Sequence, residues 1–158
     1  MILTLLMFVQ WLHILAGIAW FGGYIFIDLV IWRTLLRLPA AQAQATSDMI
    51  GRFAGPVMGT SGSLVVLLGI VRGTLLGPIK SLGFLFSTPY GFTWLVALAV
   101  ALVLTFWGAT WHERWLGPVW EDGRVRPDAA RRIWVGTIFE LACFGIVLAC
   151  MVLMGMGL

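Results

Sequence analysis

The sequence predicts an all-α integral membrane protein, a bundle of four transmembrane helices forming a single domain over residues 1–158. Of the 158 residues, 61% are hydrophobic and only 11% are charged, whereas about a quarter would be charged in a soluble domain. The nine tryptophans and nineteen glycines are typical of membrane proteins, because tryptophan anchors helices at the lipid interface and glycine lets helices approach closely. The composition therefore excludes a soluble globular domain.

Four segments are apolar and long enough to cross a membrane, since roughly 20 residues span the hydrocarbon core. The predicted helices cover residues 2–32, 54–77, 91–112 and 131–156. The polar segment LPAAQAQATSD is expected to be a connector that ends near the start of the second helix. The segment HERWLGPVWEDGRVRPDAARR mixes both signs of charge and is expected to be an interfacial loop before the fourth helix.

The positive charges predict how the bundle is oriented. Eight arginines flank the first and third links between helices, whereas only Arg72 and Lys80 flank the second. Lysine and arginine are retained on the cytoplasmic side of a membrane, so both chain ends are expected outside the cytoplasm in a multi-pass protein of the cell (inner) membrane. Because these arginines adjoin membrane spans, they indicate contact with the lipid bilayer and no nucleic-acid site.

A polar and aromatic stripe runs along the first predicted helix. Helical spacing places on one face Gln10, His13, Gly17, Trp20 or Phe21, Tyr24 and Asp28. His13 lies near the middle of the membrane, where a polar side chain is costly unless it has a partner or a function. Gly17, one turn later, leaves space beside the imidazole for a flat macrocycle or for a neighbouring helix.

Four roles fit His13: a haem b axial ligand, a copper ligand, a proton relay, or a structural hydrogen bond to another helix. Neutral imidazole binds both iron and copper, and a porphyrin needs only one protein ligand and an apolar slot. His112, near the end of the third predicted helix, fits a second cofactor site, an interfacial histidine in a tryptophan-rich belt, or a proton or quinone role. That belt consists of Trp107, Trp111 and Trp115.

Glu140 places a carboxylate inside the fourth predicted helix. An unpaired carboxylate is costly in lipid, so Glu140 is expected to be paired or hydrogen-bonded, with Arg52, Arg33 and His112 as candidate partners. A proton or quinone-linked role is the alternative. Asp28 and Arg52 belong with Glu140 to the same candidate proton or ion-pair site.

The second predicted helix carries glycines at three-to-four spacing. These are Gly51, Gly55, Gly59 and Gly62. Such a face is suited to close helix packing, including a homodimer, and it could equally make room for a planar ligand. Pro56 is expected in the first turn of this helix, where proline is tolerated.

Cys143 and Cys150 share one face of the fourth predicted helix, about 10 Å apart along its axis by the helical rise. They are too far apart to form a disulfide with each other, and packing is their expected role. With Met151 and Met154 nearby, the alternative is a soft-ligand site for Cu(I).

The pattern His13-x6-Trp20-Phe21-Gly22-Gly23 resembles the first helix of the CopD-like membrane superfamily, which includes copper-resistance D domains. It is also similar to HemJ-type protoporphyrinogen oxidases and to small four-helix membrane proteins. The resemblance continues more weakly in the segment GRFAGPVMGTSG, in Gly69 and in His112. It implies a small helical bundle that binds haem b through His13.

The expected function is therefore that of a membrane haem b protein with a redox role, or of a haem-based sensor. Electrons would pass between the haem and a quinone, an oxygen species or a partner protein, which includes activity as a haem-dependent membrane oxidoreductase. The residues expected around the haem are His13, Gly17, Trp20, Tyr24 and His112. The alternatives are a copper-handling transport protein and a structural membrane subunit without a cofactor.

Overall fold

The computed structural model of the chain describes residues 2–111, 114–115, 117–121 and 124–158. Four helices are long and apolar enough to cross a membrane, as predicted. They cover Leu3–Leu35, Ala40–Leu75, Pro89–Thr110 and Ala129–Gly155. The fold thus fits an all-α, multi-pass membrane protein.

Three of the four spans contain a π-helical turn, in which each hydrogen bond closes over one residue more than in an α-helix. The first span consists of α1 (Ile2–Phe26), η1 (Ile27–Ile31) and α2 (Trp32–Leu35). The second consists of α3 (Ala40–Ile70) and η2 (Val71–Leu75), and the short helix α4 (Leu82–Ser87) follows it. The third consists of α5 (Pro89–Phe106) and η3 (Trp107–Trp111), and the fourth is α7 (Ala129–Gly155).

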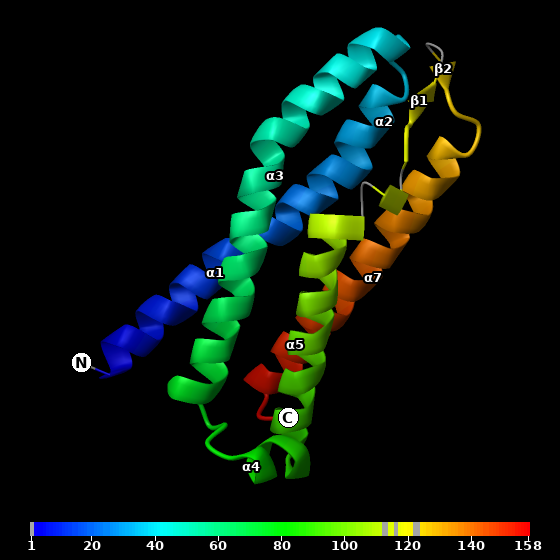
Figure 1. The fold of residues 1–158 in the computed structure, drawn as a ribbon. Helices are drawn as coiled ribbons and strands as arrows, with labels where there is room; N and C mark the ends of the chain where they lie inside the picture. The colour runs from blue at the N-terminus through cyan, green and yellow to red at the C-terminus, as the bar shows by residue number, and fades with distance from the viewer. Residues whose placement is uncertain (1, 112–113, 116, 122–123) are drawn as a thin grey trace.

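The spans run alternately up and down, so that the two chain ends lie on the same side of the bundle as α4 (Figure 1). The opposite side holds the connection between α2 and α3 and a small hairpin of β1 (Trp120–Glu121) and β2 (Arg124–Val125). We call this opposite side the arginine-rich end, because the arginines of both predicted cytoplasmic links belong to it. α1 packs chiefly against α3, and α5 against α7.

Large apolar side chains point outward along all four spans. Examples with more than half of the side chain exposed are Leu3, Phe8, Ile18, Phe53, Val103 and Ile138. An exposed apolar surface of this extent would be unfavourable in water, and it is the surface expected of helices in contact with a lipid bilayer. The interior is aromatic at its centre, where the rings of Trp20 and Phe144 meet edge to face at 5.0 Å.

The second span begins at Ala40, so the predicted start at residue 54 was wrong. The segment AAQAQA is polar by hydropathy but consists of good helix formers, and Pro39, with ψ at 137°, precedes its first turn. Pro56 consequently lies inside α3 and not in a first turn. Thr60, one turn later, donates its hydroxyl to the Pro56 carbonyl.

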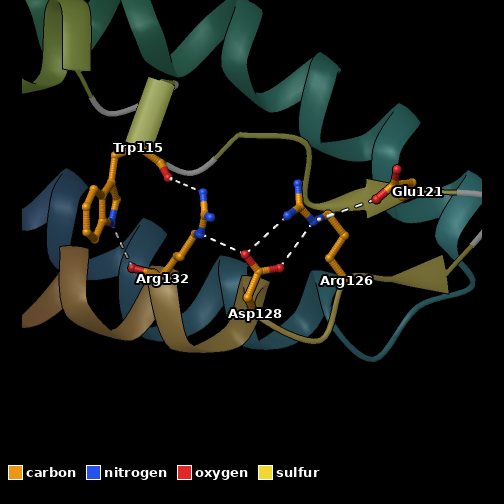
Figure 2. A network of polar contacts seen from close by, with 5 residues as sticks. All are labelled: Trp115, Glu121, Arg126, Asp128 and Arg132. Atoms are coloured by element: carbon orange, nitrogen blue, oxygen red, sulfur yellow. Dashed lines mark hydrogen bonds and ion pairs between the residues drawn. The ribbon is translucent and has the colours of Figure 1, made fainter.

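The loop expected before the fourth span contains the β1–β2 hairpin, in which Trp120 pairs with Val125 and Glu121 with Arg124. A network of charged groups joins this hairpin to the start of α7 (Figure 2). Asp128 accepts two hydrogen bonds from Arg126, at 3.1 and 3.2 Å, and its Oδ2 lies 2.8 Å from Nε of Arg132. These groups are partly exposed, so each pair contributes about 1 kcal/mol or less.

Candidate functional site

The polar stripe of the first span faces the bundle interior, as predicted, and it borders two cavities. Gln10, His13 and Gly17 line the first cavity. Tyr24 and Asp28 line the second. Trp20 is only 3% exposed and lines both cavities, so its ring forms part of the wall between them.

The first cavity, which we call the His13 cavity, has a volume of about 470 Å³. This volume lies within the range of typical ligand sites. All four spans contribute to its mostly apolar lining, which includes Val65, Gly69, Trp94, Ala97, Phe144 and Val147. Its character is therefore that of a site for an apolar, flat or elongated group.

His13 supplies an imidazole nitrogen to this cavity. One side of the ring lies within hydrogen-bonding reach of the Val65 carbonyl, which is the inter-helix contact expected of a structural histidine. Its Nδ1 is buried and has no hydrogen-bond partner in the part of the chain that the structure describes. A Cβ at Gly69 would lie 3.4 Å from Cε1 of His13, so this glycine gives the ring its space.

Arg72, in η2, brings a positive charge to the same cavity. Its Nε donates a hydrogen bond to Oε1 of Gln10, and its charge is close enough to influence His13. Trp94 donates its indole N–H to the Gly69 carbonyl over 3.3 Å. From the sequence, Arg72 was expected only as a charge flanking the second link, although Gln10 in the polar stripe could have indicated a polar partner at this depth.

The second cavity, which we call the Asp28 cavity, has a volume of about 840 Å³ and lies toward the arginine-rich end. The glycine face of α3 lines it. A Cβ at Gly51, Gly55 or Gly59 would meet nothing within 4 Å, whereas one at Gly62 would lie 2.8 Å from Cε2 of Trp20. Three glycines of this face thus border open space within the chain, whereas Gly62 packs against Trp20. The homodimer expected from the same face stays a prediction.

Two carboxyl groups are buried beside the Asp28 cavity. Asp28 is 5% exposed and Glu140 is 1% exposed. Nε1 of Trp107 donates a hydrogen bond to Oε1 of Glu140 over 2.7 Å, so the prediction that Glu140 is hydrogen-bonded is confirmed. The carboxyl of Asp28 is within reach of Glu140, and the Tyr24 hydroxyl lies against the backbone of Gly108 nearby.

The contacts of Glu140 with Trp107 and Asp28 were not expected from the sequence. Among the expected partners, Arg33 places its guanidinium 4.9 Å from the centre of the Trp134 ring. Arg52 is exposed and lines the Asp28 cavity. His112, also expected near Glu140 or at a second cofactor site, falls outside the described residues.

The fourth span carries sulfur atoms that are potential soft metal ligands, in addition to the imidazole of His13 on the first span. Met151 and Met154 line the His13 cavity, while Cys143 and Cys150 are free thiols, as expected. Within the described ranges no three residues of the types His, Cys, Asp and Glu cluster closely enough to hold a metal ion among them. Metal binding in the His13 cavity would thus depend on His13 with help from sulfur ligands or from a cofactor.

Comparisons with protein-family models, with curated proteins and with solved structures found no match to this chain. The resemblance to CopD-like and HemJ-type proteins therefore stays a prediction. The fold fits an all-α membrane protein with four helices long and apolar enough to cross a membrane. One cavity is lined by the imidazole of His13, and the other by the carboxyl group of Asp28.

Proposed function

We propose that the chain is a haem b-binding membrane protein with a redox role, in which His13 is the axial ligand of the iron. The observation that carries this proposal is the buried Nδ1 of His13, which has no partner among the described residues and belongs to a ring lining a mostly apolar cavity. A structural role explains the approach of the ring to Val65, but it does not explain the apolar cavity beside the ring.

The residues around His13 fit a haem in size and chemistry. The cavity volume of about 470 Å³ and its aromatic lining suit a flat apolar macrocycle. The haem also carries carboxylate groups, which need positive partners, and Arg72 is held at this cavity by Gln10. Gly17 and Gly69 leave the space around the imidazole free of side chains.

A bound haem would supply one-electron transfer or binding of a small gaseous ligand. His13 would hold it through a neutral imidazole nitrogen, and Arg72 would balance the charge of its carboxylates. Trp20 and Phe144, packed together at 5.0 Å, would exclude water from the side of the cavity that faces the second cavity. The redox partner is proposed to be a quinone, an oxygen species or a partner protein.

The orientation and the membrane are part of the same proposal. The excess of arginine at one end of the bundle supports a cytoplasmic location for that end and an inner (cell) membrane protein with both chain ends outside. A reporter enzyme fused after Leu158 should be active outside the cytoplasm. Cytoplasmic activity of this fusion would contradict the orientation.

Visible absorption of the purified protein tests the haem. Wild-type protein expressed with ample haem should show a Soret band, and His13→Ala should lose most of it while still inserting into membranes, because the bond from the protein to the iron is gone. His13→Gly should regain the band when free imidazole is added. His112→Ala should lose less, and haem content unchanged in His13→Ala would contradict the assignment.

A copper site is the second candidate, because Met151 and Met154 line the same cavity as His13. Thioether and imidazole are suitable ligands for Cu(I). Metal analysis of the same preparations separates the two candidates: colourless protein that holds copper, and loses it in Met151→Leu and Met154→Leu, would replace the haem proposal. Colourless and metal-free protein would favour a structural subunit.

A further inference from the structure

Two carboxyl groups lie side by side in the interior of the bundle. Asp28 belongs to η1 and Glu140 to α7, and the two groups are close enough to share a hydrogen bond. A hydrogen bond needs a donor, whereas two ionised carboxylates supply only acceptors. The contact is therefore a hydrogen bond only when one of the two groups is protonated.

Trp107 distinguishes the two carboxyls. Its indole N–H donates to Oε1 of Glu140 over 2.7 Å, and such a donor stabilises an ionised carboxylate. Oδ2 of Asp28 is buried and has no hydrogen-bond donor in the part of the chain that the structure describes. A proton on the Asp28 carboxyl would let it donate a hydrogen bond to Glu140.

Burial favours a protonated Asp28 for a second reason. Two negative charges in contact repel strongly where water is excluded, and each loses its hydration. Carboxyl pairs in such surroundings share one proton. Among the described residues, the other titratable or charged groups that face the pair or its cavity are Tyr24, Cys143, Asp48 and Arg52. Of these, only Arg52 is cationic, and its side chain is exposed.

The Asp28 cavity gives the pair a route to the surface. Its lining extends from Asp28 and Tyr24 to the polar residues Gln44, Asp48 and Arg52 of α3. The Gln44 and Asp48 side chains are exposed, so this part of the cavity opens at the arginine-rich end. A cavity of about 840 Å³ that has polar side chains along part of its wall is large enough for several water molecules.

We propose that Asp28 and Glu140 form a proton-binding site, which exchanges one proton with the arginine-rich end through the Asp28 cavity. A hydronium ion at that end gives its proton to Oδ2 of Asp28 and becomes water. The new O–H group donates a hydrogen bond to the carboxylate of Glu140, and no other bond breaks. The site requires neither His13 nor haem, so it stands independently of the proposed function.

Infrared spectroscopy of the full chain in lipid nanodiscs tests the site. At neutral pH, wild-type protein should show the C=O band of a protonated carboxyl, shifted in D₂O and absent from Asp28→Asn. Glu140→Gln gives a second test if Asp28→Asn does not fold, because the new amide N–H supplies Asp28 with a donor and the band should again be absent. A band that persists in both variants would overturn the proposal, as would its absence from the wild type.

The route is tested by the rate at which the carboxyl band shifts after transfer to D₂O. Gly59→Leu should slow the shift by about tenfold or more, because its side chain occupies open space in the Asp28 cavity and displaces water. Gly145→Leu is the matched control, since Gly145 is exposed, lines neither cavity and also has nothing within 4 Å. Equal rates in the two variants would overturn the route.

Exchange of potassium for sodium at constant pH separates a proton site from a metal-cation site. The proposal expects the same carboxyl band in both salts. Loss of the band in sodium would show that a cation replaces the proton between the two carboxylates, and the site would then be a sodium site.

Discussion

The His13 cavity and the Asp28 cavity adjoin each other but place polar groups in the membrane interior in opposite ways. In the His13 cavity a single imidazole stands among apolar and aromatic side chains, with Arg72 tied to Gln10 beside it. In the Asp28 cavity, one side of which is formed by glycines of α3, Asp28 lines the wall and lies within reach of the buried carboxyl of Glu140. The first arrangement offers an unused ligand atom, and the second offers a place for a proton.

This difference shows why a buried polar residue in a membrane helix has to be judged with its neighbours. His13 and Asp28 lie on the same stripe of the same span, yet one faces bulky apolar groups and the other faces a second acid. Trp20 lies between them and contributes to both cavities. The following variants test whether the two cavities are separate and differently lined, in order of decreasing expected effect.

Trp20→Ala should join the two cavities and lower the free energy of unfolding by about 3–5 kcal/mol, the usual cost of removing a buried aromatic side chain. Reversible unfolding in mixed detergent micelles measures this change. Trp11→Ala is the matched control on the same helix, since Trp11 is 64% exposed, and its effect should stay within about 0.5 kcal/mol. Equal losses of unfolding free energy in Trp20→Ala and Trp11→Ala would show that the buried Trp20 side chain contributes no more to stability than an exposed one.

Gly62→Ala should lower the free energy of unfolding by about 1–3 kcal/mol through overpacking, because its Cβ would lie 2.8 Å from the Trp20 ring. Gly59→Ala, on the same face of α3, has open space around its Cβ. It should raise the stability by about 0.5–1 kcal/mol, since alanine favours a helix over glycine. The same unfolding measurement applies. If Gly62→Ala and Gly59→Ala change the stability in the same direction, the Asp28 cavity does not have the described open space at Gly59 and close contact at Gly62.

Trp107→Phe should cost about 1–2 kcal/mol, because it removes the indole N–H that Glu140 accepts and leaves a buried acceptor with one donor fewer. Trp11→Phe makes the same chemical change at an exposed site and should leave the stability nearly unchanged. A Trp107→Phe protein as stable as the wild type would show that the hydrogen bond to Glu140 does not contribute to the stability of the bundle.

The helical bundle and the inward stripe of the first span could be predicted because both depend on one-dimensional patterns. The length of an apolar run sets a span, and spacing along a helix sets a face. Hydropathy failed at the segment AAQAQA, where helix propensity extends α3 to Ala40. Hydropathy measures the preference for lipid, and it does not detect a helix that continues beyond the apolar core.

The contacts between residues of different spans could largely not be predicted from the sequence. Asp28 and Glu140 meet because the first and fourth spans cross at one depth, and Trp107 reaches Glu140 from the third. The similar depths of Asp28 and Glu140 in the membrane could have suggested that they are partners, but partners of opposite charge were expected for Glu140. The open space at Gly59 also depends on how the other spans pack around α3, which the spacing of residues along one helix does not reveal.

The π-helical turns have a consequence for how this chain can change by insertion and deletion. η1 contains Asp28, η2 contains Arg72 and η3 contains Trp107. Asp28 and Arg72 each line one of the two cavities, and Trp107 donates a hydrogen bond to Glu140. A π turn takes up one residue more than an α-helical turn, so loss of one residue from it can restore an unbroken α-helix while the flanking segments keep their faces. A one-residue deletion within α1 would instead rotate the two parts of that helix by about 100° relative to each other. The two cavities are therefore expected to tolerate the loss of a residue better at a π turn than in the α-helical part of the same span.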